Sequence, residues 1–329
     1  MNGYRLLIFL LLLSLFRHQY VTASIKPRDP YDYEQLQRDL ERLKHEFGDL
    51  LHIESIGTSL YGKPLWSIRI GKGSEYVLLV GAHHGREWIS ANLLMMLTEQ
   101  YAHEYREGKG RGKHSPAVFD QISLVVIPML NPDGVDIQQG KIPPDVFFEL
   151  WLMNEGSFDF SRWKANGAGI DLNRQYAAGW TELPSPDAPS YKFYKGEKPL
   201  VAKEVKHLVQ FVRKNPPLSA LSFHSAGQEI YWQFGQKQNI ARDYCIGERL
   251  SRLTGYPLAS PPQEAVGGGF TDWFIEEFAR PGFTIELCKG RGETHPDIRE
   301  LDAEWKRNRD IGYVLIEEIL QQTVIVPDG

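Results

Sequence analysis

Apolar and polar positions follow two different periods along the chain. Residues 32–48 place apolar side chains at steps of three and four, which predicts a helix that ends at Gly48. Similar patterns predict helices over residues 88–105, 199–214, 240–253 and 298–322. Short apolar runs predict strands over residues 52–57, 65–70, 76–80, 122–128, 218–224, 229–234 and 283–287. Residues 140–168 and 261–269 are expected to be loops, and Asn131-Pro132-Asp133-Gly134 is typical of a turn.

The alternation of strands with helices predicts the fold class. We expect an α/β fold with a mixed, mostly parallel central sheet that helices flank on both faces. No linker-like stretch follows Ser24, so residues 24–329 should form a single domain. Ligands of such sheets bind at the carboxyl ends of the strands. His84, His224 and Glu286 all lie at or near predicted strand ends, and could meet at one rim of the sheet.

The first 23 residues have the pattern of a signal peptide. A short positively charged start precedes an apolar run over residues 6–16, which is too short to span a bilayer core of about 30 Å. Val21-Thr22-Ala23 then offers small residues for a signal peptidase. An uncleaved membrane anchor is the alternative, but Arg17 and His18 end the apolar run early. We therefore expect a secreted protein, extracellular or associated with a cell wall, with no stable membrane span after cleavage.

Composition and charge narrow the class of protein further. Hydrophobic residues make up 42% and charged residues 24% of the chain, which is ordinary for a globular domain. The net charge of −5 and the lack of a basic stripe in the sequence argue against a nucleic-acid partner. Cys245 and Cys288 could pair in a secreted chain or remain as buried thiols. They do not have the spacing of a cysteine metal site.

Three residues are candidates for a metal site. His84 and Glu87 form a His-x-x-Glu pair where a strand meets a helix, and His224 ends a later strand. Catalytic zinc sites commonly use three protein ligands and leave a fourth position for water or substrate. Each signal is weak by itself, because a His-x-x-Glu pair arises by chance and a histidine at a strand end is often only hydrogen-bonded.

Two further stretches carry candidate catalytic or binding groups. Glu286 lies within the apolar run 283–287, where a carboxylate is costly to bury without a partner. It could face solvent on an edge strand, or act as the general base for a metal-activated water. Asp171-Leu172-Asn173-Arg174 could form a surface loop, or Arg174 could bind a carboxylate through its two-pronged guanidinium group.

Taken together, these motifs resemble the zinc metallocarboxypeptidase family, the carboxypeptidase A-like peptidases. The matching pieces occur in the family's order and span about residues 60–290: His84-Gly85-Arg86-Glu87-Trp88, Asn131-Pro132-Asp133-Gly134, Asp171-Leu172-Asn173-Arg174, Phe223-His224-Ser225, Gly268-Gly269-Phe270-Thr271-Asp272-Trp273 and Phe283-Thr284-Ile285-Glu286-Leu287. Each motif is weak alone, whereas six in the same order are hard to reach by chance.

The resemblance implies a role for most of the candidate residues. It implies that His84, Glu87 and His224 bind one Zn²⁺ and that Glu286 activates the attacking water. Asp171 would orient a ligand histidine. The residues expected to contact substrate are Arg86, beside the zinc, and Asn173 and Arg174, which would hold a terminal carboxylate. His83 would point to the opposite face of the strand from His84, so it is given no role.

The sequence departs from the family pattern at two positions. Lys164 follows a tryptophan where the family has an oxyanion-stabilising arginine, and Arg162 is the alternative for that role. Glu264 stands where the family has a mobile tyrosine. It could pair with a substrate ammonium or be an exposed loop acid. Thr271 is expected in the specificity pocket, where its hydroxyl favours a polar substrate side chain.

The stretches around residues 267–275 and 280–286 are similar to a bacterial branch of the family, the γ-D-glutamyl-diaminopimelate peptidases. That similarity implies a peptidase of murein-derived cell-wall peptides. Three alternatives stay open. The chain could be an ordinary metallocarboxypeptidase that releases single C-terminal amino acids, a non-catalytic peptide-binding protein, or a zinc amide hydrolase of small acyl-amino acids.

Overall fold

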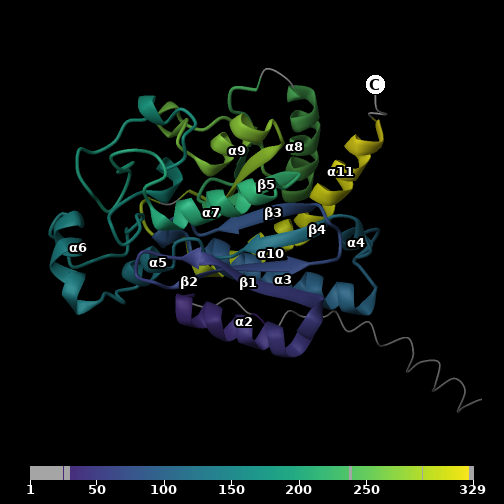
Figure 1. Ribbon diagram of the computed structural model, residues 1–329, viewed down its shortest axis with the longest axis horizontal. Coiled ribbons are helices and arrows are strands. Elements are labelled where there is room, and N and C mark those ends of the chain that lie inside the picture. Colours follow the sequence, from purple (N-terminus) through teal and green to yellow (C-terminus); the bar gives the residue numbers. More distant parts are fainter. Residues whose placement is uncertain (1–24, 26–29, 237–238, 291, 326–329) are drawn as a thin grey trace, which may run out of the picture.

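The computed structural model describes residue 25 and residues 30–236, 239–290 and 292–325. The predicted signal peptide, residues 1–23, lies outside these residues. In the described chain, eight strands form one sheet in the order β1-β2-β4-β3-β5-β8-β6-β7 (Figure 1). Their bounds are Leu51–Thr58 (β1), Pro64–Ile70 (β2), Tyr76–Gly81 (β3), Ser123–Ile127 (β4), Ser219–Ser225 (β5), Glu229–Tyr231 (β6), Leu258–Ala259 (β7) and Gly282–Leu287 (β8).

The centre of the sheet is parallel. Strands β4, β3, β5 and β8 pair in parallel, whereas β1, β2 and β4 form antiparallel pairs and β6 runs antiparallel to β8. Every residue of β3 and β4 is buried, as the continuous apolar runs of these strands predict. The predicted α/β fold with a mixed, mostly parallel sheet is confirmed.

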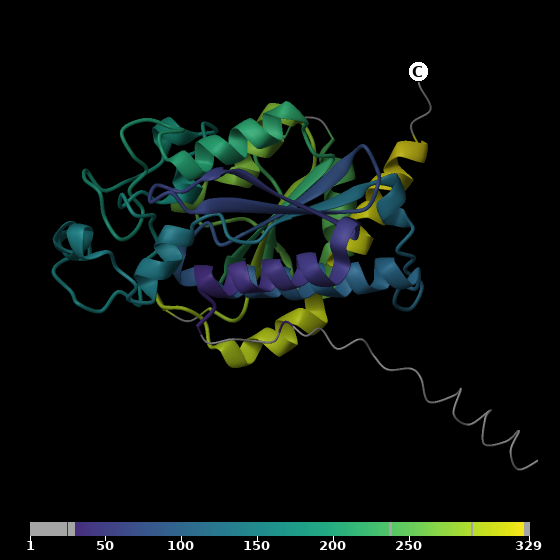
Figure 2. The ribbon, with the colours of Figure 1, turned by 60° about the horizontal axis from the view of Figure 1, so that its bottom comes forward.

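Helices cover both faces of the sheet (Figure 2). On one face lie α2 (Tyr33–Phe47), α3 (Ile89–Glu107), α8 (Ile240–Thr254), α10 (Leu301–Asn308) and α11 (Ile311–Ile325). On the other face lie α7 (Lys203–Lys214) and α9 (Phe270–Phe278). Successive residues of β3 join these two cores in turn, because side chains of a strand alternate between its faces. The short helices are α4 (Val118–Gln121), α5 (Pro132–Gln138) and α6 (Phe147–Met153).

The prediction of a single helix over residues 298–322 is wrong, because the segment folds as two helices, α10 and α11. The Asn308 side chain donates to the Glu304 carbonyl at the end of α10. In the first turn of α11, the Gly312 amide donates to the Tyr101 hydroxyl of α3. This tertiary hydrogen bond satisfies an amide at the start of a new helix, and the apolar period carries no signal for it.

Two predicted loops contain short helices. Asn131-Pro132-Asp133-Gly134 begins α5 instead of forming a turn: the Asn131 side chain accepts from the Gly134 amide, and Pro132 occupies the first helical position. The loop-rich prediction for residues 140–168 misses α6.

Cys245 is exposed and Cys288 is buried, and they do not form a disulfide, so the pairing that the sequence left open does not occur. Among the described residues, we find no helix with the length and apolar character needed to cross a membrane.

Candidate metal centre and active-site cavity

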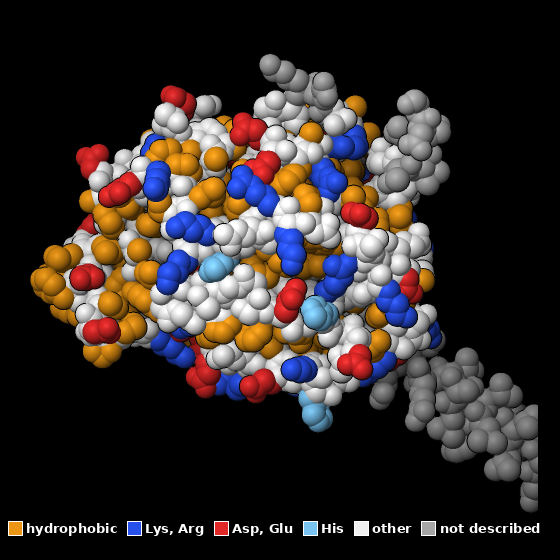
Figure 3. All heavy atoms as spheres, in the orientation of Figure 1, with side chains coloured by type: hydrophobic (Ala, Val, Ile, Leu, Met, Phe, Trp, Pro, Cys, Tyr) orange, Lys and Arg blue, Asp and Glu red, His pale blue; other side chains and the backbone are white. Residues whose placement is uncertain are grey.

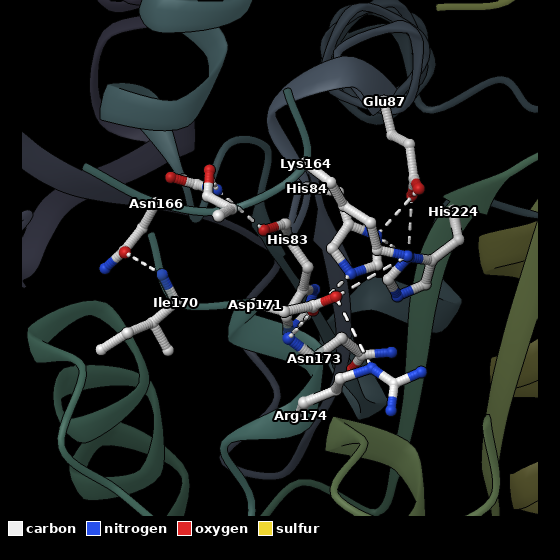
Figure 4. Close-up of polar contacts among 12 residues, drawn as sticks. His83, His84, Glu87, Lys164, Asn166, Ile170, Asp171, Asn173, Arg174 and His224 are labelled. Atoms are coloured by element: carbon white, nitrogen blue, oxygen red, sulfur yellow. Dashed lines mark hydrogen bonds and ion pairs between the residues drawn. The ribbon is translucent and has the colours of Figure 1, made fainter. Parts of the chain in front are cut away.

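The three candidate metal ligands meet at the carboxyl edge of the sheet (Figure 4). His84 follows β3, Glu87 ends the 3-10 turn Gly85–Glu87, and His224 lies on the adjacent parallel strand β5. A Glu87 carboxylate oxygen lies 2.8 Å from His84 Nδ1, and the other lies 2.9 Å from His224 Nδ1. The two Nδ1 atoms are 3.2 Å apart. All three side chains are buried, so their donor atoms converge on one point away from bulk water.

The outer nitrogen of each histidine has a partner of its own. His84 Nε2 lies 3.0 Å from an Asp171 carboxylate oxygen, and His224 Nε2 lies 3.0 Å from the Ser222 hydroxyl. Such contacts fix the ring orientation and leave Nδ1 available for a metal. Two imidazole nitrogens and one carboxylate are also the donor set of many catalytic zinc sites. The residues present therefore fit a zinc ion.

His83 lies behind this cluster. Its ring is stacked on that of His224, with centroids 5.3 Å apart, and its nitrogens contact the Tyr176 hydroxyl at 3.0 Å and Ser222 at 3.3 Å. The alternation that assigned His83 to the opposite face does not apply, because β3 ends at Gly81 and Ala82 has a φ of 47°. His83 thus supports a candidate ligand, and burial lowers its pKa well below the usual value.

Asp171 joins the cluster to nearby cations. Its second carboxylate oxygen lies 3.9 Å from Lys164 Nζ and 3.8 Å from Arg174 Nε. Burial by itself would raise the pKa of Asp171, but Lys164 and His84 outweigh it and hold the pKa well below the usual range. Burial would also raise the pKa of Glu87, yet His84 and His224 lower it. Both acids are therefore carboxylates at neutral pH.

Glu286 faces the cluster from the next strand. It pairs in register with His224 across β5 and β8, and both residues line a cavity of about 290 Å³ that contains the metal cluster. Burial, and then the Glu87 carboxylate, raise the pKa of Glu286 to about 8, while Lys164 opposes the rise. A carboxyl group whose pKa lies near neutrality can both accept and return a proton.

The cavity wall includes part of the predicted substrate site. Arg86, Lys164, Asn173 and Thr271 all line it. The Arg86 guanidinium donates to the Glu293 carbonyl at 2.7 Å, and the Asn173 amide oxygen accepts from the Phe270 backbone at 3.0 Å.

The two candidates for the oxyanion role differ in position. Lys164 reaches the cavity, whereas Arg162 is not among the residues that line it. The Arg162 guanidinium instead binds the Asn154 carbonyl, the Glu155 carboxylate and the Tyr191 hydroxyl. Of the two, the structure therefore presents Lys164 to a substrate.

Arg174 and Glu264 lie beside the cavity and do not line it. Arg174 is buried, and its guanidinium donates to the carbonyls of Pro184 and Glu264 at 3.1 and 3.2 Å. The Glu264 residue itself is exposed on the loop after β7. Two neighbours in that loop, Pro261 and Ala265, do line the cavity, so the loop as a whole borders it.

Two residues of the pocket wall, Thr284 and Asp272, were not among the predicted site residues. The Thr284 hydroxyl lies 2.7 Å from that of Thr271, and Asp272 lies beside this pair with its carboxylate accepting from the Gly267 amide. Burial raises the pKa of Asp272 to about 6. Thr284 precedes Glu286 by two positions on β8, so strand alternation predicts that it faces the same side.

Comparisons with known proteins agree with this geometry. The sequence profile described as "Zinc carboxypeptidase" matches residues 36–311. The chain is 33% identical over 279 residues to "Gamma-D-glutamyl-L-diamino acid endopeptidase 1" of Lysinibacillus sphaericus. The aligned region covers 83% of this chain and 69% of that protein. The chain is 25% identical over 282 residues to carboxypeptidase B of Bos taurus, with 79% and 63% covered. The crystal structure of thrombin activatable fibrinolysis inhibitor has the same fold, with a TM-score of 0.73 at 19% identity, over 89% of this chain and 77% of that one.

Proposed function

Since this chain belongs to the zinc carboxypeptidase family and is a metallopeptidase, we propose that it is secreted and cleaves the bond between a γ-D-glutamyl residue and diaminopimelate in murein-derived cell-wall peptides. The relative from Lysinibacillus sphaericus, whose name specifies a γ-D-glutamyl–diamino acid bond, supports this substrate class.

The observation that carries the proposal is the polar wall of the cavity. Thr271 and Thr284 present paired hydroxyl groups, and Asp272 also lines the cavity. Hydroxyl groups both donate and accept hydrogen bonds, and a carboxylate attracts an ammonium. Diaminopimelate carries a second carboxylate and a second amine. A wall of this kind suits such a side chain better than it suits a large apolar one.

The metal ligands and Glu286 would perform the hydrolysis. His84, Glu87 and His224 would hold the zinc ion, with Asp171 orienting His84. A bound zinc ion supplies a Lewis acid that polarises the scissile carbonyl and makes water more acidic. Glu286 would take the proton of the attacking water and return it to the leaving amine, since it lines the cavity and pairs in register with the candidate ligand His224.

Lys164 and Arg86 would act on the substrate carbonyl. Both line the cavity beside the metal cluster, so their positive charges face the place where negative charge develops. Lys164 presents a point charge, unlike the two-pronged guanidinium group of an arginine.

Asn173 and Arg174 would bind the carboxylate of the substrate. Asn173 lines the cavity, whereas Arg174 does not and has its guanidinium 3.8 Å from the Asp171 carboxylate, so we assign Asn173 the direct contact and Arg174 the supporting charge. Glu264, on the loop that borders the cavity, would meet a substrate ammonium.

Incubation with two substrates tests the proposed bond specificity. L-Ala-γ-D-Glu-diaminopimelate should be cleaved between glutamate and diaminopimelate, while a panel of C-terminal dipeptides should react much more slowly. The Glu286→Gln protein is the matched negative control for both substrates. Release of ordinary C-terminal residues without cleavage of the γ-D-glutamyl bond would favour the alternative, a carboxypeptidase of the usual kind, which the bovine carboxypeptidase B relative supports.

The proposed secretion needs a separate test. Expression of the full chain should release a protein shortened by residues 1–23 into the medium, and deletion of these residues should keep it inside the cell. N-terminal sequencing of the released protein gives the cleavage site, and an unprocessed chain in the medium would contradict the signal-peptide assignment.

A further inference from the structure

A second cavity lies at the opposite end of the central strands from the metal cluster. Its volume is about 590 Å³, and its wall combines residues of α7 with residues of β1 and β2. Tyr76, which begins β3, lies in this wall, whereas His84 follows the end of the same strand. A six-residue strand is about 20 Å long, so the two cavities are well separated.

The path of β1 helps to explain why this hollow exists. The pairing of β1 with β2 shifts between Ser55 and Gly57, which marks a bulge. The His207 ring of α7 packs directly on this bulge: a Cβ atom added at Gly57, where φ is +150°, would lie 2.2 Å from His207 Cγ. The helix therefore meets the sheet at a residue without a side chain. Beside this contact, polar residues of β1 and β2 on this face are left without a covering helix.

The charged residues on the exposed side of α7 are all basic, and Gln210 is the neutral residue among them. Lys203, Lys206 and Lys214 are exposed, and no ion pair joins them to another residue in the described part of the chain. The acid in this helix, Glu204, is buried and accepts from the Leu60 amide. Arg213 differs from the lysines because it is already paired with Glu277. Figure 3 shows Lys and Arg side chains gathered across the middle of this face.

The facing wall of the cavity adds to the positive charge. Arg69 of β2 lines the cavity together with Lys214 of α7. One acid, Glu54, lies in the wall, and its carboxylate is 3.4 Å from His52 Nε2. The chain as a whole has a net charge of −5, so this concentration of positive charge is a local feature that the fold assembles.

We propose that this groove binds a flexible polyanion with repeated phosphate groups. Lys214 lines the groove, whereas Lys203 lies outside its lining, eleven positions earlier on α7, with the two backbones about 17 Å apart along the helix. One small anion cannot contact cations spread over that length, whereas a polymer can contact several at once. Lysine ammonium groups bind phosphate oxygens as point charges and need no paired geometry. The groove would hold the enzyme to such a polymer without occupying the active site.

Binding of linear polyphosphate tests this proposal. Titration of the full chain at low salt should give saturable binding that weakens steeply as salt rises, because counterions compete for the same charges. Lys214→Glu should weaken binding at least tenfold. Lys44→Glu is the matched control, since it makes the same charge change at an exposed site on α2, across the sheet, and should bind like the unmodified protein. Thermal unfolding of both variants verifies that they fold.

Three results would overturn the proposal. Equal weakening by Lys214→Glu and Lys44→Glu would show that only net charge matters. If orthophosphate at the same phosphorus concentration displaced polyphosphate completely, the groove would be a site for small anions and not for a polymer. Tighter binding of double-stranded DNA than of polyphosphate would reassign it to nucleic acid. Hydrolysis of small peptides by Lys214→Glu should be unchanged. Failure of polyphosphate binding would therefore not count against the proposed peptidase activity, and failure of peptide hydrolysis would not count against the groove.

Discussion

The two halves of the active-site cavity are built differently. The metal half comes from the ends of adjacent strands, and a hydrogen bond to the outer nitrogen of each of its histidines fixes the ring. The substrate half combines different kinds of element: Thr284 lies on β8, Thr271 on α9, and Lys164 on the irregular segment between α6 and α7. Strand register thus fixes the reacting groups, whereas the substrate half depends on how a helix and irregular segments pack against the sheet.

Asp171 connects these halves. One carboxylate oxygen holds His84, and the other faces Lys164 and Arg174. The following predictions test whether the two halves are separable, from the largest expected effect to the smallest.

Loss of a metal ligand should have the largest effect. We expect His224→Ala to lose its zinc and at least about 10³-fold in activity, because metal ions contribute several kcal/mol of charge stabilisation in the transition state. Metal analysis of the purified protein and the hydrolysis rate provide the readout. His45→Ala, at an exposed site on α2, is the control and should keep both properties. Full zinc occupancy in His224→Ala would exclude this histidine as a ligand.

Removal of the proposed base should lower turnover strongly and leave metal binding unchanged. Glu286→Gln should lower kcat by about 10² to 10⁴, the usual contribution of general acid–base catalysis. The amide is close in size to the carboxyl, so zinc content should be normal. A near-normal rate would remove Glu286 from this role.

Substitutions at Lys164 and Arg162 test which of the two residues stabilises the oxyanion. Lys164→Met should reduce kcat by about 10² to 10³, the effect of losing one oxyanion donor. Lys164→Arg should restore part of the rate because it returns the charge. Arg162→Met serves as the comparison and should cost little, since its guanidinium binds Glu155 and Tyr191 outside the cavity. Equal losses in the two methionine variants would contradict the assignment of Lys164.

Asp171→Asn should have the smallest effect of the four. Loss of the group that orients a metal-bound histidine weakens metal affinity by about 10- to 100-fold, so the defect should be repaired by excess zinc. Competition with a chelator measures the affinity. A rate defect that persists at saturating zinc would show that Asp171 also acts on the substrate half, through Lys164 or Arg174.

The sequence predicted the sheet and the meeting of the metal ligands more closely than it predicted the loops. The predicted strands 76–80, 218–224 and 283–287 differ by about a residue from β3, β5 and β8, because each is an apolar run in a fully covered sheet. The direction of the Arg174 side chain depends on its hydrogen bonds to the carbonyls of Pro184 and Glu264. These residues lie 10 and 90 positions further along the chain, so a local sequence pattern does not predict the contacts. The contact of His83 with Ser222 depends on the backbone of Ala82, whose positive φ has no signal in an alanine.

The neighbouring strands β3, β5 and β8 carry groups that are far apart along the polypeptide. His84 and His224 are separated by 140 positions, and Glu286 follows later still. During translation, at about 5–20 residues per second, the ribosome therefore needs on the order of ten seconds after His84 to deliver His224, the second candidate ligand histidine. Until β8 has been made, the nascent chain lacks the proposed base Glu286, so we expect a polypeptide truncated before residue 286 to have no peptidase activity.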